Sequence, residues 1–492
     1  MHLDVSRWRR ATSAAIVGVL GTMALAQTAI AQGAGYPDPQ KPDSSQDWTL
    51  RYKGITIQPI GFFAGEAVFR NRNETADIAS SFNAIPFSGT TNAKLTEFRG
   101  SGRQSRLALL ISGDAGGVKL TNYVETDFLS AGVTSNSNES NSYTLRMRQF
   151  WMQAGLSNGF TFTGGQMWTL LTTSKSGIAT RNEEYPLTID AQYVPGFDWN
   201  RQWAFRFTDT FSKNAAAAIS FEGAQATTGG HGIPTQVIYG NLGTSPLNTT
   251  ATYSTDLTPD VVAKIAFDQP WAHLEFKAIG MTFRDRIVDT TAASTFGGSR
   301  TVIRTGGGVG VGLGLHPVGK FLDIGLSGLW GRGIGRYGTS QLADVTARPN
   351  GDIDPIRAAH GLLSIVAHPT PKLDIYDYAG AEYQYRDNYV TAAGKGEGYG
   401  SPLLSNAGCE EEALVTGTAN YNAGAGTCNA DTRVIWQEAV GFWYRFYNGK
   451  AGRVQWGVQY SYTSRNTWSG LDGIQPNAID GMVFTSVRYY FP

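Results

Sequence analysis

From Ile55 onward the chain repeats one pattern about sixteen times: a run of roughly ten to fifteen residues in which apolar side chains alternate with polar or small ones. The clearest run spans residues 454–463. Alternation with a period of two is typical of a β-strand with one apolar and one polar face. Strands in soluble sandwiches usually have five or six residues, whereas crossing the hydrocarbon of a bilayer takes about 9–11. The pattern therefore predicts transmembrane strands, which must close into a barrel to satisfy their backbone hydrogen bonds.

The expected fold class is an all-β, antiparallel transmembrane barrel of sixteen strands, with fourteen or eighteen as the alternatives. Seven of the joints between strands are short and rich in turn formers, and the other eight are long. Short turns are expected on the periplasmic side and long loops outside. The predicted strands are 54–70, 101–113, 118–129, 142–156, 160–169, 201–211, 214–225, 259–268, 271–286, 300–316, 320–335, 353–368, 372–387, 432–447, 452–464 and 480–491.

The first residues have the order of a secretory signal peptide. Three arginines within residues 1–10 precede an apolar stretch at 14–26, and the pattern Ala29-Ile30-Ala31 favours cleavage after Ala31, with Ala26 as the second candidate position. We therefore expect export to the bacterial outer membrane. The predicted domains are the signal peptide at 1–31, a flexible periplasmic leader at 32–53 and the outer-membrane barrel at 54–492.

Charge and cysteine content exclude some classes of partner and predict one cross-link. Without residues 1–31 the chain has 37 basic and 39 acidic residues, and no basic run points to nucleic acid. Cys409 and Cys428 are its two cysteines and fall in one long loop of an exported chain, so a disulfide is expected; a metal pair is the alternative. Residues 350–354 resemble part of a Ca²⁺ loop but lack its remaining ligands, so a polar turn is expected there. No cofactor or metal is predicted.

Several short motifs, in order along the chain, are similar to those of one porin family. They are Ser105-Arg106-Leu107, Glu125-Thr126-Asp127-Phe128, Leu145-Arg146-Met147-Arg148-Gln149, Gly165-Gln166-Met167-Trp168-Thr169, Arg201-Gln202 and the closing stretch 484–490. The chain resembles the DcaP-like branch of bacterial porins. That resemblance implies a trimeric, sixteen-stranded channel, although residues 32–50 show no heptads for the coiled-coil leader found in some members.

Alternation also assigns side chains to the lumen of the predicted barrel. A charged side chain facing lipid at mid-depth costs about 2–4 kcal/mol, so charged residues on the strands are placed inward. A turn centred between Ala115 and Gly116 would put Arg106 directly across from Glu125. Two interpretations stay open: ion pairs within the wall, or a net cationic strip that recruits anions through the guanidinium fork. The predicted pore-lining residues are Arg106, Glu125, Asp127, Arg146, Arg148 and Arg206.

The third long loop, between Leu170 and Trp199, corresponds to the loop that folds into the lumen of general porins. If it does so here, its acids would face the basic wall and set a transverse field across a constriction. An acidic surface loop is the alternative. The predicted constriction residues are Glu183, Glu184 and Asp190, with Asp198 beside them.

The sequence carries little that points to an enzyme. Five histidines remain after residue 31, and no Ser or Cys lies in a nucleophile elbow. His360 is the one candidate for a lipid-hydrolysing barrel and is expected instead in the lumen or at an interface. The predicted function is passive diffusion of small hydrophilic solutes, with mild anion preference, through a homotrimer in outer-membrane lipid. A barrel enzyme acting on lipid and a loop-based adhesin are the alternatives.

Overall fold

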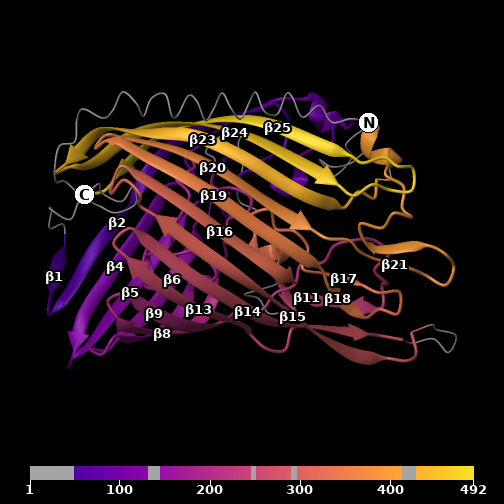
Figure 1. Ribbon diagram of the computed structural model, residues 1–492, viewed down its shortest axis with the longest axis horizontal. Helices are drawn as coiled ribbons and strands as arrows, with labels where there is room; N and C mark the ends of the chain where they lie inside the picture. Colours follow the sequence, from indigo (N-terminus) through magenta and orange to yellow (C-terminus); the bar gives the residue numbers. More distant parts are fainter. Residues whose placement is uncertain (1–48, 131–143, 245–250, 290–295, 413–427) are drawn as a thin grey trace.

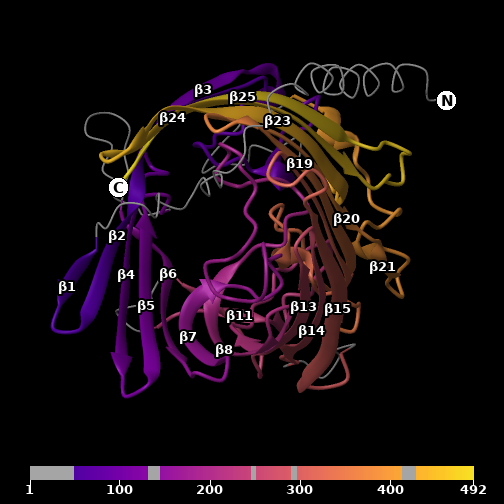
Figure 2. The same ribbon diagram turned by 60° about the vertical axis from the view of Figure 1, so that its left-hand side comes forward.

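The computed structural model describes residues 49–130, 144–244, 251–289, 296–412 and 428–492. Sixteen long strands form one antiparallel sheet, and the first of them, β2 (Ile55–Arg70), pairs with the last, β25 (Asn477–Tyr490). The sheet thus closes into a barrel (Figures 1 and 2). The prediction of a sixteen-stranded, all-β transmembrane barrel is confirmed.

The strands follow one another around the wall in sequence order, since each long strand pairs with the next. Between β2 and β25 the barrel strands are β4 (Arg106–Ala115), β5 (Val118–Asp127), β6 (Arg146–Gly155), β7 (Phe160–Trp168), β8 (Arg201–Ser212), β9 (Ala215–Glu222), β13 (Asp260–Gln269), β14 (Ala272–Ile287), β15 (Arg300–Leu315), β16 (Leu322–Arg332), β19 (Arg357–Thr370), β20 (Leu373–Gln384), β23 (Thr432–Gly449) and β24 (Gly452–Thr467).

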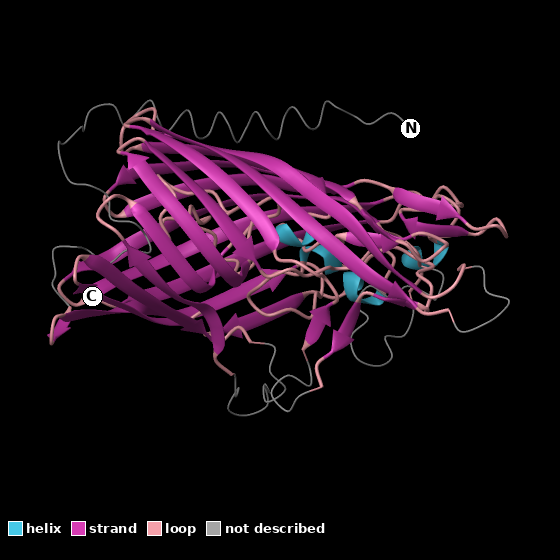
Figure 3. Ribbon diagram, turned by 90° about the horizontal axis from the view of Figure 1, so that it is seen from below, coloured by secondary structure: helices cyan, strands magenta, loops and turns pink. Residues whose placement is uncertain are grey.

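In the described residues, four 3-10 helices and several short strands lie among the loops that join the barrel strands (Figure 3). The helices are η1 (Phe82–Ala84), η2 (Thr91–Lys94), η3 (Gly335–Tyr337) and η4 (Ala407–Glu410). The short strands are β1 (Leu50–Tyr52), β3 (Glu97–Ser101), β10 (Val237–Ile238), β11 (Gly240–Leu242), β12 (Thr252–Ser254), β17 (Val345–Ala347), β18 (Ile353–Pro355), β21 (Asp387–Val390) and β22 (Gly396–Tyr399). In the part of the chain that the structure describes, no helix has the length and apolar character needed to cross a bilayer.

The strand expected at 101–113 is two segments that share one position in the wall. The C-terminal half of β2 (residues 66–70) pairs with β3, and its N-terminal half (residues 56–62) pairs with β4. Residues 102–105 leave the ladder between them, and Ser105 Oγ accepts a hydrogen bond from the Ala64 amide at 3.0 Å. A side-chain oxygen thus replaces a missing backbone acceptor. Similarly, the strand expected from residue 353 begins at Arg357, because β18 pairs with β17 instead.

The turn between β4 and β5 lies one residue further along than expected. Its two central residues are Gly116 and Gly117, with φ angles of +66° and +88°, so the predicted centre between Ala115 and Gly116 is wrong. Two-residue hairpin turns favour positive φ at both positions, which glycine adopts without strain. Consequently Arg106 stands across from Asp127, and Glu125 stands across from Ala108.

The N-terminal predictions fall mostly on residues outside the described ranges. The proposed signal peptide and residues 32–48 of the proposed leader lie there. The last residues of that leader are not extended coil, because β1 pairs with the start of β2 through Leu50 and Ile57. The proposed leader therefore ends in a short hairpin that joins the barrel wall.

Candidate functional site

Loop 3, defined here as residues 169–200 between β7 and β8, lies inside the barrel and reaches its opposite wall. The amide of Leu187 donates to the Tyr378 hydroxyl at 2.9 Å, and the amide of Ile189 donates to Gln459 Oε1 at 2.5 Å. In the other direction, Trp443 Nε1 donates to the Leu187 carbonyl at 2.8 Å. Figure 2 looks into the barrel with these inner segments in view. Loop 3 therefore narrows the lumen and is fixed to β20, β23 and β24.

Loop 3 rests on the wall backbone to backbone. A Cβ atom on Gly380 of β20 would lie 1.9 Å from the Pro195 carbonyl oxygen, and one on Gly196 would lie 2.0 Å from the Gly361 oxygen of β19. The Gly196 amide also donates to Glu382 Oε1 at 2.9 Å. This contact, the glycine seat, consists of Pro195 and Gly196 against Gly361 and Gly380. Any larger residue at Gly196 or Gly380 would force the loop and wall apart.

Two buried lysines hold the start of loop 3. Lys264 Nζ donates to the Thr172 carbonyl and Lys277 Nζ to the Leu171 carbonyl, each at 2.6 Å. Glu275 lies between the two ammonium groups, 3.0 Å from Lys264 and 3.2 Å from Lys277. Because a buried charge is costly unless it is paired, this cluster fixes loop 3 firmly to β13 and β14.

A hollow of about 310 Å³ separates loop 3 from the wall formed by β2, β4, β5 and β6. Four cations and two anions line it, together with the aromatic side chains of Phe62, Tyr123, Trp168, Tyr185, Tyr193 and Tyr490. The charged lining residues are Arg106, Arg148, Lys175, Arg181, Glu125 and Glu183.

The wall side of this hollow is a network of ion pairs. Arg148 bonds Glu125 at 2.6 Å and Asp127 at 2.8 Å, while Arg146 bonds Asp127 at 2.8 Å. Arg106 lies 3.7 Å from Glu125, although the strand register places it across from Asp127. A β-bulge in the β5–β6 pairing leaves Arg148 without a residue opposite it on β5. The alternation of faces is broken there, and the successive side chains of Arg148 and Gln149 are both buried. The network holds three arginines and two acids.

The loop side of the hollow is more basic than its sequence suggested. Arg181, whose φ is +66°, places its guanidinium 4.6 Å from the centre of the Tyr123 ring, and Lys175 also lines the hollow. Sequence reasoning missed both, because a loop shows no alternation that assigns its side chains to a face. Of the four loop acids, only Glu183 lines this hollow; it accepts a hydrogen bond from the Tyr185 hydroxyl at 2.6 Å.

The other three loop acids face elsewhere. Glu184 lines a smaller hollow of about 70 Å³ on the opposite side of loop 3. Asp198 is buried against His360 at 3.1 Å and Lys277 at 3.6 Å. Asp190 is also buried and accepts from the amides of Ser80 and Gln192 at 3.1 and 2.9 Å, and burial raises its pKa to about 6. Asp190 and Asp198 attach loop 3 to its surroundings, and the expected acidic face opposite the arginines is reduced to Glu183.

Three of the six predicted lining residues do not line the larger hollow. Asp127 and Arg146 pair with each other in the ion-pair network of the wall, and the third is Arg206. Its side chain is buried beneath loop 3, where it donates to the Trp168 carbonyl at 2.5 Å. Arg201 was not among the predicted lining residues, yet it stacks on Trp168 with its guanidinium 4.5 Å from the ring centre, beside the arginine network. Alternation assigns a side chain to the lumen but does not reveal whether an inserted loop covers it.

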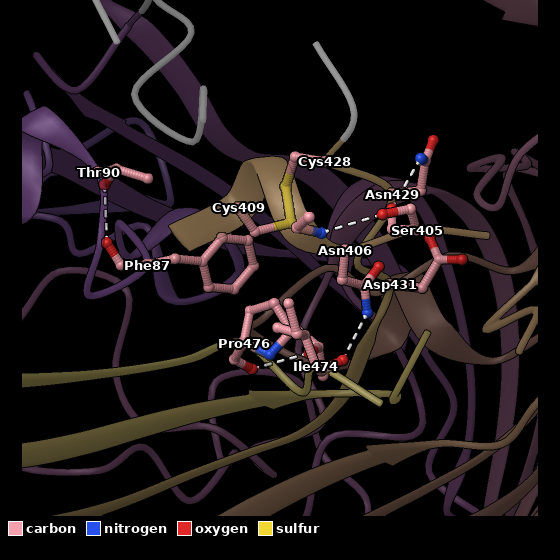
Figure 4. Close-up of a disulfide and its surroundings, with 12 residues drawn as sticks. Phe87, Thr90, Ser405, Asn406, Cys409, Cys428, Asn429, Asp431, Ile474 and Pro476 are labelled. Atoms are coloured by element: carbon pink, nitrogen blue, oxygen red, sulfur yellow. Dashed lines mark hydrogen bonds between the residues drawn. A yellow bond between two sulfur atoms is a disulfide. The ribbon is translucent and has the colours of Figure 1, made fainter. Parts of the chain in front are cut away.

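Away from the lumen, Cys409 and Cys428 form a disulfide with an S–S distance of 2.05 Å. Figure 4 shows the bridge beside Phe87, with Ile474 and Pro476 nearby. Cys409 belongs to an apolar cluster with Ile85, Phe87 and Ala478. The bridge therefore joins two parts of loop 7 (residues 385–431), and it packs against loop 1 (residues 71–96) and the start of β25.

The segment considered for Ca²⁺ binding uses its acids for ion pairs. Asp352 bonds Arg300 and Arg304 at 2.7 and 2.8 Å, and Asp354 bonds Arg348 at 2.6 Å. Within the described ranges, no group of three or more His, Cys, Asp or Glu side chains has an arrangement that could hold a metal ion. These carboxylates stabilise the outer loops instead.

Comparison with known proteins identifies solved structures with the same architecture. The crystal structure of the outer membrane channel DcaP of Acinetobacter baumannii has a TM-score of 0.60 and 17% sequence identity over 90% of this chain and 99% of that one. An anion-selective porin from Comamonas acidovorans gives a TM-score of 0.48, with 10% identity over 89% of this chain and 100% of that one. No protein-family model and no curated protein matches the chain. The likeness to DcaP shows a shared fold and agrees with the resemblance of the short motifs.

Proposed function

We propose that the chain is an outer-membrane porin for the passive diffusion of small hydrophilic solutes, with a mild preference for anions. The observation that carries this proposal is the hollow between loop 3 and the β2–β6 wall, with four cations and two anions on its lining. The fold shared with the DcaP channel supports the same reading. A homotrimer in outer-membrane lipid is part of the proposal.

The excess of positive over negative side chains on the lining of the larger hollow is the reason to expect a preference for anions. Arg106 and Arg148 share Glu125 with each other, and Arg181 and Lys175 outnumber Glu183 on the loop side. An arginine cannot lose its proton to escape a poorly solvated channel. At physiological salt the Debye length is about 8 Å, comparable with a narrowed pore, so these charges act across the opening. The preference should be strongest at low salt.

Reconstitution in planar bilayers tests the proposal. We expect stepwise conductance and a reversal potential of anionic sign under a KCl gradient. Replacing both Arg146 and Arg148 by Ala should shift that potential towards cations. A protein that gives no conductance steps but hydrolyses phospholipid would be a barrel enzyme, and one that gives neither but binds cells would be an adhesin. Single-channel work with carboxylates, phosphate and sugars would then define the solutes.

The position of His360 favours the porin over the lipid-acting enzyme. A hydrolase working on membrane lipid needs its histidine at the outer surface near the rim. The His360 side chain is fully buried and bonded to Asp198 of loop 3, on the inner side of the wall. Its role in the proposed porin is to help hold that loop.

A further inference from the structure

Two arginines lie side by side on the barrel where the long loops begin. Arg332 ends β16 and Arg357 begins β19, and the two stand directly opposite each other in the strand register. Both side chains are exposed. Like charges at such positions repel and destabilise a sheet unless something compensates for them.

Strand alternation places the pair on the outer surface. Arg332 shares its face of β16 with Leu326 and Trp330, whose side chains are 50% and 52% exposed, and Arg357 shares its face of β19 with Leu363. These apolar side chains form part of the lipid-facing belt. Trp330 is one alternation step below Arg332, at the level where aromatic residues mark the edge of the hydrocarbon. The arginines therefore lie at headgroup depth on the long-loop side.

Protein groups neutralise this pair only weakly. Among the described residues, no carboxylate oxygen lies within 4.0 Å of either guanidinium, so neither arginine forms an ion pair. The arginines of the lumen, in contrast, are paired. Arg357 lies beside the rings of Trp330 and Tyr385, whose centres are 6.0 and 5.5 Å from its guanidinium carbon. Asp387 is close enough to interact electrostatically with Arg332, and the Asp387 carboxylate accepts a hydrogen bond from the Tyr389 hydroxyl. A surplus of positive charge thus faces the membrane boundary.

We propose that Arg332 and Arg357 bind a phosphate group of the outer-leaflet glycolipid. Two guanidinium forks can hold the oxygens of one phosphate from both sides, which removes the repulsion between them. Trp330 and Tyr385 supply apolar and cation–π contacts beside the headgroup. The site is separate from the lumen, so it stands whether or not the channel function is confirmed.

Titration of the full-length, folded protein in mild detergent with fluorescent diphosphorylated lipid A tests this site. Replacing both arginines (Arg332→Gln and Arg357→Gln) should weaken binding about 30-fold, since each arginine contributes about a factor of five or more at a lipid surface. The matched control is Lys320→Gln, which removes one exposed charge from the short turn at the other end of β16 and should leave binding unchanged. The double Arg→Lys variant keeps the charge but loses the forks, and should recover binding only in part. Heat-modifiable migration on gels checks that each variant is folded.

Four results would overturn the proposal. Unchanged lipid A affinity in the double Gln variant would exclude these arginines, and equal affinity for dephosphorylated lipid A would exclude the phosphate. Complete displacement of the lipid by millimolar inorganic phosphate would indicate a site for free anions. A change in subunit number in the double Gln variant would indicate that this face contacts a second copy of the chain.

Discussion

Arg148 Nε lies 2.6 Å from Glu125 Oε1 across the β5–β6 pair, and less than a tenth of either side chain is exposed. The contact binds the two strands together on the inner side of the wall and also sets the local charge of the larger hollow. Structure and selectivity are thus coupled at this pair. They can be separated by comparing substitutions here with substitutions on loop 3.

Removing Arg148 should weaken the barrel itself. The Arg148→Gln change leaves Glu125 and Asp127 with fewer partners, and breaking a buried ion pair from one side costs about 3–5 kcal/mol. We expect a loss towards the lower end, because Arg106 and Arg146 remain close. Denaturant unfolding in lipid measures it. The double variant with Glu125→Gln should lose less than the sum of the single changes, and strict additivity would contradict the coupling.

Removing Arg181 should change selectivity without changing stability. Its side chain has a ring contact with Tyr123 and lines the hollow from loop 3. Arg181→Gln should lower the anion-to-cation permeability ratio, read from reversal potentials, while the free energy of unfolding changes by less than about 1 kcal/mol. Lys320→Gln, in a short turn, is the control and should leave the ratio unchanged. An unaltered ratio in Arg181→Gln would show that the wall alone sets the sign.

Adding a single methyl group in the glycine seat should lower thermal stability and change the conductance. In Gly380→Ala the new Cβ would meet the Pro195 oxygen, so loop 3 or β20 must move, at a cost of about 1–3 kcal/mol. We expect lower thermal stability and a changed single-channel conductance. Gly361→Ala on the neighbouring strand is the matched control, because its Cβ would have nothing within 4 Å. Identical conductance in both variants would mean that the loop does not limit the current.

The contact between loops 1 and 3 should depend on pH through Asp190. Burial raises the pKa of this carboxyl to about 6 from its ordinary 3.8, so in the folded loop it stays neutral up to a higher pH than in the unfolded chain. The stability that protonated Asp190 contributes to the folded loop is fully present below pH 4 and is lost as the pH rises through 6. The total loss is about 3 kcal/mol of folding free energy. Hydrogen exchange at the Ser80 and Gln192 amides, corrected for intrinsic rates, should show faster opening at neutral pH. Asp190→Asn should abolish this dependence, and a dependence that persists would assign it to another group.

The disulfide should stabilise loop 7 and leave conduction alone. A bridge across a sequence separation of 19 contributes about 3 kcal/mol in the chain-entropy model. In the variant with both Cys409→Ser and Cys428→Ser, we expect faster proteolysis of loop 7 and unchanged conductance. Peptide mass mapping without reductant should find the linked fragments in the native protein. Two free thiols would refute the bridge.

Strand alternation was enough to predict the barrel. It gave the number of strands, and it placed Arg106, Arg146 and Arg148 on the inner side, because lipid excludes charge from the outer face at mid-depth. It misplaced the β4–β5 turn by one residue, although Gly116-Gly117 carried the signal for positive φ. The break at 102–105 had no such signal, since it depends on Ser105 reaching the Ala64 amide on another strand.

Loop 3 marks the limit of what the sequence could predict about the site. Its position in chain order suggested a place in the lumen, with an acidic surface loop as the alternative. The directions of Lys175, Arg181 and Asp190 depend on contacts with distant elements, such as the Asp190 bonds to Ser80. A loop without a repeating pattern carries no local information about such contacts. The covering of Arg206 follows from the same tertiary placement.

The glycine seat also bears on how the proposed current should vary with temperature. A constriction held backbone to backbone at Gly380 and Gly196 leaves loop 3 little space to move against β19 and β20. Ion flow through such an aperture is limited by the mobility of ions in water. Its temperature coefficient should therefore follow the viscosity of the electrolyte, and the open-channel trace should be quiet, without the flicker of a moving gate.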